Sequence, residues 1–137
     1  MMNETILVIG LPGTGKSTYT KRNMDDASIC YDLDAIAAAF RLSNPHEEDH
    51  KPARKMANDL FKGFTMKAHE YARRLFIIRT APTIDQVMQM DPTKIVICKE
   101  RFEARPMEDE QAARDRINQV ESYAKGVNIP LEIIDRS

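Results

Sequence analysis

The stretch Gly10-Leu11-Pro12-Gly13-Thr14-Gly15-Lys16-Ser17 matches the phosphate-binding pattern Gly-x-x-x-x-Gly-Lys-Ser in full. It follows the apolar, β-branched run from Thr5 to Ile9, which predicts a strand buried on both faces. It also opens a helix that we expect to run from Lys16 to about Met24. In this setting, the pattern predicts a loop that binds the phosphates of a nucleoside triphosphate, and ATP with Mg²⁺ is the expected ligand.

The residue types of this loop suit that chemistry. Its glycines allow a tight turn that presents backbone N–H groups to phosphate oxygens. Lys16 supplies a positive charge for the β and γ phosphates, and Ser17 offers a hydroxyl to Mg²⁺. Thr18 is a second hydroxyl for the α phosphate, although local packing explains it nearly as well. The expected nucleotide-binding residues are Gly10, Pro12, Gly13, Thr14, Gly15, Lys16, Ser17 and Thr18.

The rest of the chain alternates short apolar runs with helical periodicity. Further strands are expected at 28–31, 75–78, 95–98 and 131–134, and further helices at 33–42, 52–72, 84–90 and 108–125. Thr83 is the expected N-cap of one helix, and Gly126 the expected cap at the end of another. This alternation predicts one α/β domain over residues 1–137, a three-layer sandwich with a five-stranded, mostly parallel sheet.

Composition places few limits on the binding partners. The net charge is −1, so no overall attraction to nucleic acid or anionic membranes is expected. No apolar run approaches the roughly 20 residues that a membrane span requires. Cys30 and Cys98 lie in expected strands, where buried thiols in a reducing compartment are the simplest interpretation. We therefore expect a cytoplasmic protein, and the sequence predicts no oligomeric state.

Two carboxylates follow the second expected strand, in Asp32-Leu33-Asp34. Because parallel strands end at the same edge of a sheet, both should lie near the phosphate loop. One could accept the proton of an attacking hydroxyl, and the other could hold Mg²⁺ through water. Alternatively, either residue could simply be the N-cap of the helix that follows.

Together, Gly-Leu-Pro-Gly-Thr-Gly-Lys-Ser-Thr, the short strand and Asp-x-Asp resemble the small P-loop kinases, such as polynucleotide 5′-hydroxyl kinases, adenylylsulfate kinases and gluconate kinases. The resemblance follows the order of elements along nearly the whole chain. It implies strand order 2-3-1-4-5 and a transfer of the γ-phosphoryl group to a hydroxyl or phosphate, on a nucleoside, nucleotide, polynucleotide end or small metabolite. By the same resemblance, Asp34 is the base and Asp32 the acid on the magnesium side.

The sequence departs from the kinase pattern at two points. Several such kinases carry an Arg three residues after the base, where this chain has Ala37, and Arg41 is the nearest substitute. The third strand ends in Arg79-Thr80 and the fourth in Lys99 rather than in an acid, although Glu100 comes next. These departures favour an alternative function, a module that binds or slowly hydrolyses nucleotide without an acceptor.

Arginines follow the fourth strand, in the segment 99–106, where small kinases place a lid over the triphosphate. Arg101 and Arg105 are the expected catalytic pair, because guanidinium groups stabilise charge on a transferring phosphoryl group. Arg114 is a weaker candidate. Paired charges on a solvated loop are the competing interpretation. Arg79 is expected either to contact the acceptor or to pair with one of the two aspartates.

The long helix at 52–72 has a basic polar face that could guide an anionic acceptor such as a nucleotide or a nucleic-acid end. A solvated face balanced by acidic residues is the more ordinary interpretation. His46 and His50 are expected in a loop, without a third metal ligand. A nucleic-acid-binding protein that uses the loop on backbone phosphate is a third possibility, and the near-neutral charge counts against it.

Overall fold

The five expected strands form a single parallel sheet. The computed structural model describes residues 3–42, 51–99 and 109–135. Each of the four strand pairings is parallel, and the order is β2-β3-β1-β4-β5, as the sequence predicts. The strands are β1 (Glu4–Ile9), β2 (Ser28–Asp32), β3 (Arg74–Arg79), β4 (Lys94–Cys98) and β5 (Leu131–Ile134).

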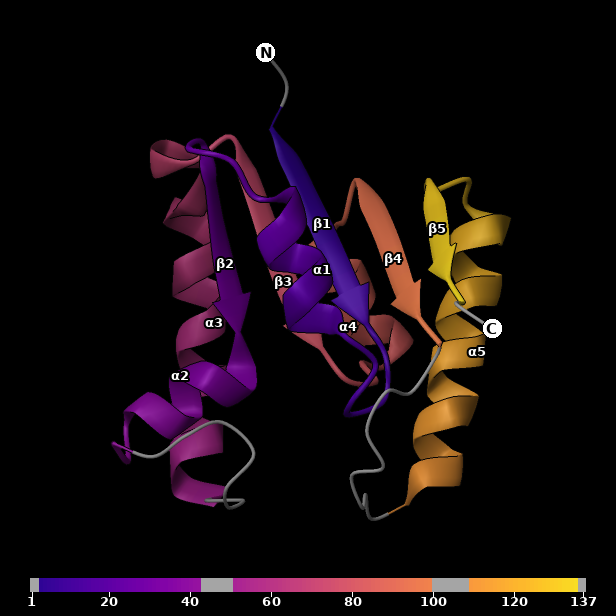
Figure 1. Ribbon diagram of the computed structural model, residues 1–137, viewed down its shortest axis with the longest axis horizontal. Coiled ribbons are helices and arrows are strands. Elements are labelled where there is room, and N and C mark those ends of the chain that lie inside the picture. The colour runs from indigo at the N-terminus through magenta and orange to yellow at the C-terminus, as the bar shows by residue number, and fades with distance from the viewer. Residues whose placement is uncertain (1–2, 43–50, 100–108, 136–137) are drawn as a thin grey trace.

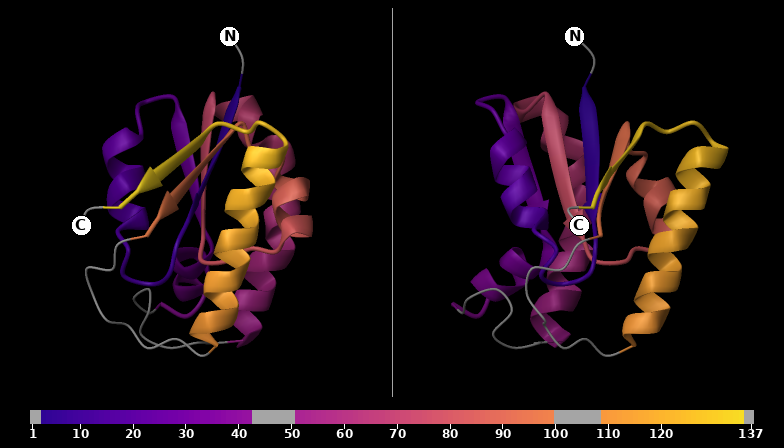
Figure 2. Two further views of the ribbon diagram at one scale, coloured as in Figure 1. Left: turned by 90° about the vertical axis from the view of Figure 1, so that its right-hand side faces the viewer. Right: turned by 45° about the vertical axis from the view of Figure 1, so that its right-hand side comes forward.

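Helices cover both faces of this sheet and complete the three-layer sandwich. One helix, α1 (Lys16–Asn23), lies on one face, and three other helices lie on the opposite face (Figures 1 and 2). Those on the second face are α3 (Lys51–Tyr71), α4 (Ile84–Met90) and α5 (Glu110–Gly126), while the short α2 (Leu33–Ala39) packs beside α3. In the described part of the chain, no helix is long and apolar enough to cross a membrane.

The alternation of side chains along β1 explains why both faces are covered. Ile6 and Val8 belong to an apolar cluster with Tyr19 of α1, whereas Leu7 and Ile9 belong to a cluster with α4 and α5. All four side chains are at most 4% exposed. A strand that is apolar at every position is stable only at the centre of a sheet that is buried on both faces.

An aromatic cluster anchors α3 on the edge strand β2. The ring of Tyr31 packs against Phe61 and Phe64, with centroids 4.8 Å and 5.1 Å away. Its hydroxyl also donates a hydrogen bond to the carbonyl of Ala57. These contacts hold the first half of α3 near the carboxyl end of β2, so Arg54 reaches the edge of the sheet where the phosphate loop lies.

Apart from the end of α2, the helix ends lie within two residues of the expected positions. Thr83 is the N-cap of α4, and with Gln86 it forms a reciprocal capping box, as expected. The expectation for Gly126 is wrong: it is the last residue of α5, and the left-handed residue that ends the helix is Asn128, with φ 61°. Similarly, α2 ends at Ala39, and a tighter turn continues to Leu42.

Candidate active site

The carboxyl ends of β1, β2 and β3 meet at one edge of the sheet, where all the arrowheads point in Figure 1. The phosphate loop leaves β1 at this edge, and the Asp32–Asp34 turn leaves β2 there. Ligands of parallel α/β sheets bind at this edge because the loops after the strands converge there. The sequence prediction that both features share an edge is therefore confirmed.

The phosphate loop is held close to the neighbouring strand ends. The N–H group of Gly10 donates to the carbonyl of Thr80, with N···O 3.1 Å. A Cβ atom at Gly10 would lie 2.5 Å from the carbonyl oxygen of Cys98, so this position has no room for a side chain. Gly13 and Gly15 have φ of 85° and 82°, a left-handed conformation that glycine adopts without strain.

The polar groups of the loop leave a cradle for an anion. The ammonium group of Lys16 donates to the carbonyls of Gly10 and Leu11, at 2.6 Å and 3.0 Å. The backbone N–H groups of Gly13 and Gly15 donate to no acceptor within the described residues. Backbone donors without partners, next to a lysine and the N-terminus of α1, form a site that fits a polyphosphate.

Asp32 is the N-cap of α2. One oxygen of its carboxylate accepts hydrogen bonds from the backbone N–H groups of Asp34 and Ala35, at 3.1 Å and 3.3 Å. The capping alternative therefore holds for Asp32. This bond orients the start of α2 and so fixes where the side chain of Asp34 lies.

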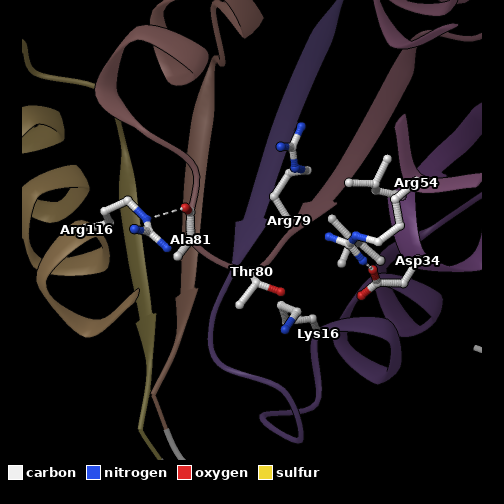
Figure 3. A pocket seen from close by; sticks show the side chains of 9 residues that line it. Lys16, Asp34, Arg54, Arg79, Thr80, Ala81 and Arg116 are labelled. Carbon is white, nitrogen blue, oxygen red and sulfur yellow. Dashed lines mark hydrogen bonds and ion pairs between the residues drawn. The ribbon is translucent and has the colours of Figure 1, made fainter. Parts of the chain in front are cut away.

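Asp34, two residues further, is paired with a residue of α3. Its carboxylate accepts from the guanidinium of Arg54, and both side chains are partly exposed. The two side chains point toward each other in Figure 3. The alternative in which Arg79 pairs with one of the two aspartates is therefore not found among the described residues, and Asp34 pairs with Arg54 instead.

A pocket lies between the phosphate loop, the end of β3 and the helices α2, α3 and α5 (Figure 3). Its volume is about 200 Å³. It is lined by four cationic side chains, one carboxylate and the ends of neighbouring strands: Lys16, Leu33, Asp34, Arg54, Ile78, Arg79, Thr80, Ala81 and Arg116. Lys16 joins this pocket to the phosphate loop, so the two sites are adjacent.

Arg79 is half-buried at the end of β3, and its guanidinium makes no hydrogen bond or ion pair to any described residue. Burial lowers the pKa of Arg79, and the neighbouring Arg54 cation lowers it further, while Tyr31 and Asp34 oppose this. Arginine nevertheless stays charged at neutral pH. A partly buried cation without a partner is costly, and an incoming anion would relieve that cost.

Solved structures similar to this chain include two from the same assembly, the Pnkp1/Rnl/Hen1 RNA repair complex. One has TM-score 0.59 and 12% identity, and the match covers 92% of this chain and 47% of that chain. The other has TM-score 0.55 and 13% identity, covering 81% and 43%. This protein therefore spans somewhat less than half of each of these two chains. A shikimate kinase from Bacteroides thetaiotaomicron has TM-score 0.48 and 17% identity, covering 95% and 85%.

The chain has the P-loop kinase fold. Its phosphate loop, its strand order and the likeness of its backbone all agree on this assignment. At identities this low, the likeness is one of fold. No protein-family model matches the sequence, and neither does any curated protein.

Some residues that the sequence singled out are not part of the described site. Arg101, Arg105, His46 and His50 lie outside the residues that the structure describes. Arg114 is on α5 and pairs with Glu110 in the same helix, at 3.2 Å. No group of His, Cys, Asp and Glu within the described ranges could hold a metal ion by itself.

Sequence reasoning missed Arg116, which reaches the pocket from α5. Its Nε donates to the carbonyl of Ala81 at 2.9 Å, and its two terminal nitrogens have no acceptor among the described residues. Arg116 lies three residues after the buried Ala113 and one before the buried Ile117. The sequence did offer one signal for Arg116, because it is a charged residue that borders the apolar face of its helix.

Proposed function

We propose that this protein is an ATP-dependent phosphotransferase that moves the γ-phosphoryl group of ATP to a hydroxyl or phosphate acceptor. The observation that carries the proposal is the common pocket of Lys16 and Asp34. A group that binds the donor phosphates and a group that can accept a proton therefore lie side by side. The fold and the geometry of the phosphate loop support the same conclusion.

In this proposal, the loop from Gly10 to Thr18 binds the triphosphate, and Lys16 exchanges its loop carbonyls for phosphate oxygens. When the acceptor is a hydroxyl, Asp34 takes its proton as the oxygen bonds to the γ phosphorus and the bond to the β-γ bridging oxygen breaks, releasing ADP. Mg²⁺ would neutralise charge on the phosphates, and the hydroxyl of Ser17 and the carboxylate of Asp32 would hold it. Arg101 and Arg105 complete the proposal as the arginines that close over the triphosphate.

A transfer assay tests this function. The protein is incubated with γ-labelled ATP, Mg²⁺ and separate nucleosides, nucleotides, oligonucleotides and sugars. We expect label to appear in at least one acceptor and to be lost in Asp34→Asn and Lys16→Ala. Asp59→Asn, an exposed position on α3, is the matched control and should leave transfer unchanged.

Different outcomes separate the competing functions. Tight ATP binding without transfer to any acceptor would overturn the proposal in favour of a module that binds or slowly hydrolyses nucleotide. Retention on an oligonucleotide in the absence of ATP, weakened by salt, would instead indicate a nucleic-acid-binding protein. A cytoplasmic location belongs to the same proposal, because the reaction needs ATP as its donor.

A further inference from the structure

We propose that the acceptor carries a phosphate group of its own, which binds in the pocket beside Lys16 that Arg79 and Arg116 both line. The inference rests on the proposed function and names the class of substrate. It is carried by two arginines whose guanidinium groups form no ion pair with a described residue, one at the end of β3 and one on α5.

The other charges of the pocket are already engaged. Lys16 lies on the phosphate loop, where it would turn to the phosphates of ATP. Arg54 is paired with Asp34, so the two contribute no net charge. Two uncompensated guanidinium groups remain, those of Arg79 and Arg116. A phosphate monoester carries about −1.5 to −2 charges near pH 7, which matches two arginines better than a carboxylate or a neutral acceptor does.

The arrangement of these arginines suits a small oxyanion. The bond from Nε of Arg116 to the carbonyl of Ala81 holds the guanidinium at the pocket and leaves its terminal nitrogens for a ligand. In Figure 3, Arg79 lies between Arg116 on one side and Arg54 with Asp34 on the other. The pocket of about 200 Å³ has room for a phosphate and a few further atoms, since a water molecule occupies about 30 Å³ in the liquid.

This placement would also orient the reacting group. A phosphate held in this pocket would keep the attached hydroxyl in the space that Asp34 and Lys16 also line. Binding energy from a non-reacting phosphate would then position the hydroxyl for attack.

Calorimetric titration tests the inference with the phosphate loop occupied. The protein is saturated with Mg²⁺ and a non-hydrolysable ATP analogue, so that added phosphates cannot bind at the loop. Ribose 5-phosphate and adenosine 3′-monophosphate are compared with ribose and adenosine, with gluconate as a carboxylate and a 5′-hydroxyl oligonucleotide as the nucleic-acid source of phosphate. We expect at least one phosphate-bearing probe to bind about tenfold or more tightly than its uncharged counterpart.

Substitution of Arg79 separates binding from folding. In Arg79→Met, the preference for phosphate should be lost, while the melting temperature should be unchanged or higher because an uncompensated cation is removed. Arg22→Met, at an exposed position near the end of α1, is the control and should keep the preference. A lower melting temperature with an unchanged phosphate preference would overturn the inference, as would equal binding of charged and uncharged probes or binding of none.

The failures of the two proposals differ. Arg79-dependent binding of phosphate without transfer to any acceptor would contradict the proposed function and leave this pocket a phosphate site. Transfer to an uncharged acceptor at the same rate in Arg79→Met would contradict this inference and leave the phosphotransferase intact. Preference for the oligonucleotide over the small phosphates would assign the phosphate to a nucleic-acid end.

Discussion

The carboxylate of Asp34 in α2 forms an ion pair with the guanidinium of Arg54 in α3, 20 residues further along the chain. Their side chains are 30% and 44% exposed, so water screens much of the interaction. The contact between α2 and α3 also includes the apolar cluster around Tyr31, Leu33 and Ala57. The ion pair therefore shapes the pocket more than it stabilises the fold.

Replacing Arg54 by alanine should accordingly change the free energy of unfolding by less than about 1 kcal/mol, as is usual for exposed ion pairs. Urea denaturation measures this change. The comparison variant is Phe61→Ala, which removes the ring that packs on Tyr31 and should cost about 2 kcal/mol or more. A loss for Arg54→Ala as large as that for Phe61→Ala would show that the ion pair holds α3 in place.

Replacing Gly10 or Gly63 by alanine should have opposite effects on the free energy of unfolding. Gly10→Ala places a Cβ atom 2.5 Å from the backbone oxygen of Cys98 and 2.6 Å from the hydroxyl of Thr14. The loop must shift, so we expect a loss of about 1–3 kcal/mol in unfolding free energy and weaker ATP binding.

The control for this loop is a glycine inside α3. A Cβ atom at Gly63 meets nothing within 4 Å. Gly63→Ala should therefore stabilise the protein by about 0.5–1 kcal/mol through helix propensity alone. Thermal unfolding and ATP titration of both variants check the pair, and unchanged ATP affinity in Gly10→Ala would contradict the close packing of the loop.

Serine and alanine at position 32 distinguish capping from metal binding. Asp32→Ala removes the acceptor for two backbone N–H groups and should cost about 0.5–2 kcal/mol. Asp32→Ser keeps a capping oxygen, so its stability should stay within a few tenths of a kcal/mol of the original. If Asp32 also holds Mg²⁺, Asp32→Ser should retain stability but need more Mg²⁺ for transfer. Equal Mg²⁺ dependence would restrict Asp32 to capping.

The thiols should be unreactive in the folded protein. Burial raises the pKa of Cys30 to about 12, with a further contribution from the Asp32 carboxylate, and burial also raises the pKa of Cys98. Because thiolates are the reactive form, iodoacetamide at pH 8 should label neither thiol until urea unfolds the chain. Rapid labelling of native Cys30 would contradict this.

The same shift gives the stability a pH dependence. The folded state holds the Cys30 proton more tightly than the unfolded state, whose thiol has a pKa of about 8.5. The stabilisation is therefore complete below that value and is lost as the pH rises toward about 12, the folded pKa. Cys30→Ala should flatten this alkaline decline in urea titrations at successive pH values.

Local sequence patterns were enough to predict the strands, the phosphate loop and the helix start at Thr83. Each depends on residues that are neighbours along the chain, through an apolar run, a turn that needs glycine or a capping side chain. The parallel arrangement follows as well, because a helix between two strands returns the chain to the end of the sheet where the first strand began. The strand order came from the resemblance of the motif to known kinases.

Tertiary structure alone decided which charged side chains form ion pairs with each other and which line the pocket. Whether Asp34 pairs with Arg54 or Arg79 depends on where the aromatic cluster of Tyr31 holds α3 against β2. Likewise, Arg116 enters the pocket because α5 packs beside α4, β4 and β5 and brings this side chain to Ala81, in the loop after β3. Such contacts join residues far apart in the chain. The spacing of apolar residues predicts which face of a helix is buried, but it does not predict which residues of other elements that face contacts. The sequence by itself therefore determined the phosphate-binding half of the site, and packing determined the cationic pocket beside it.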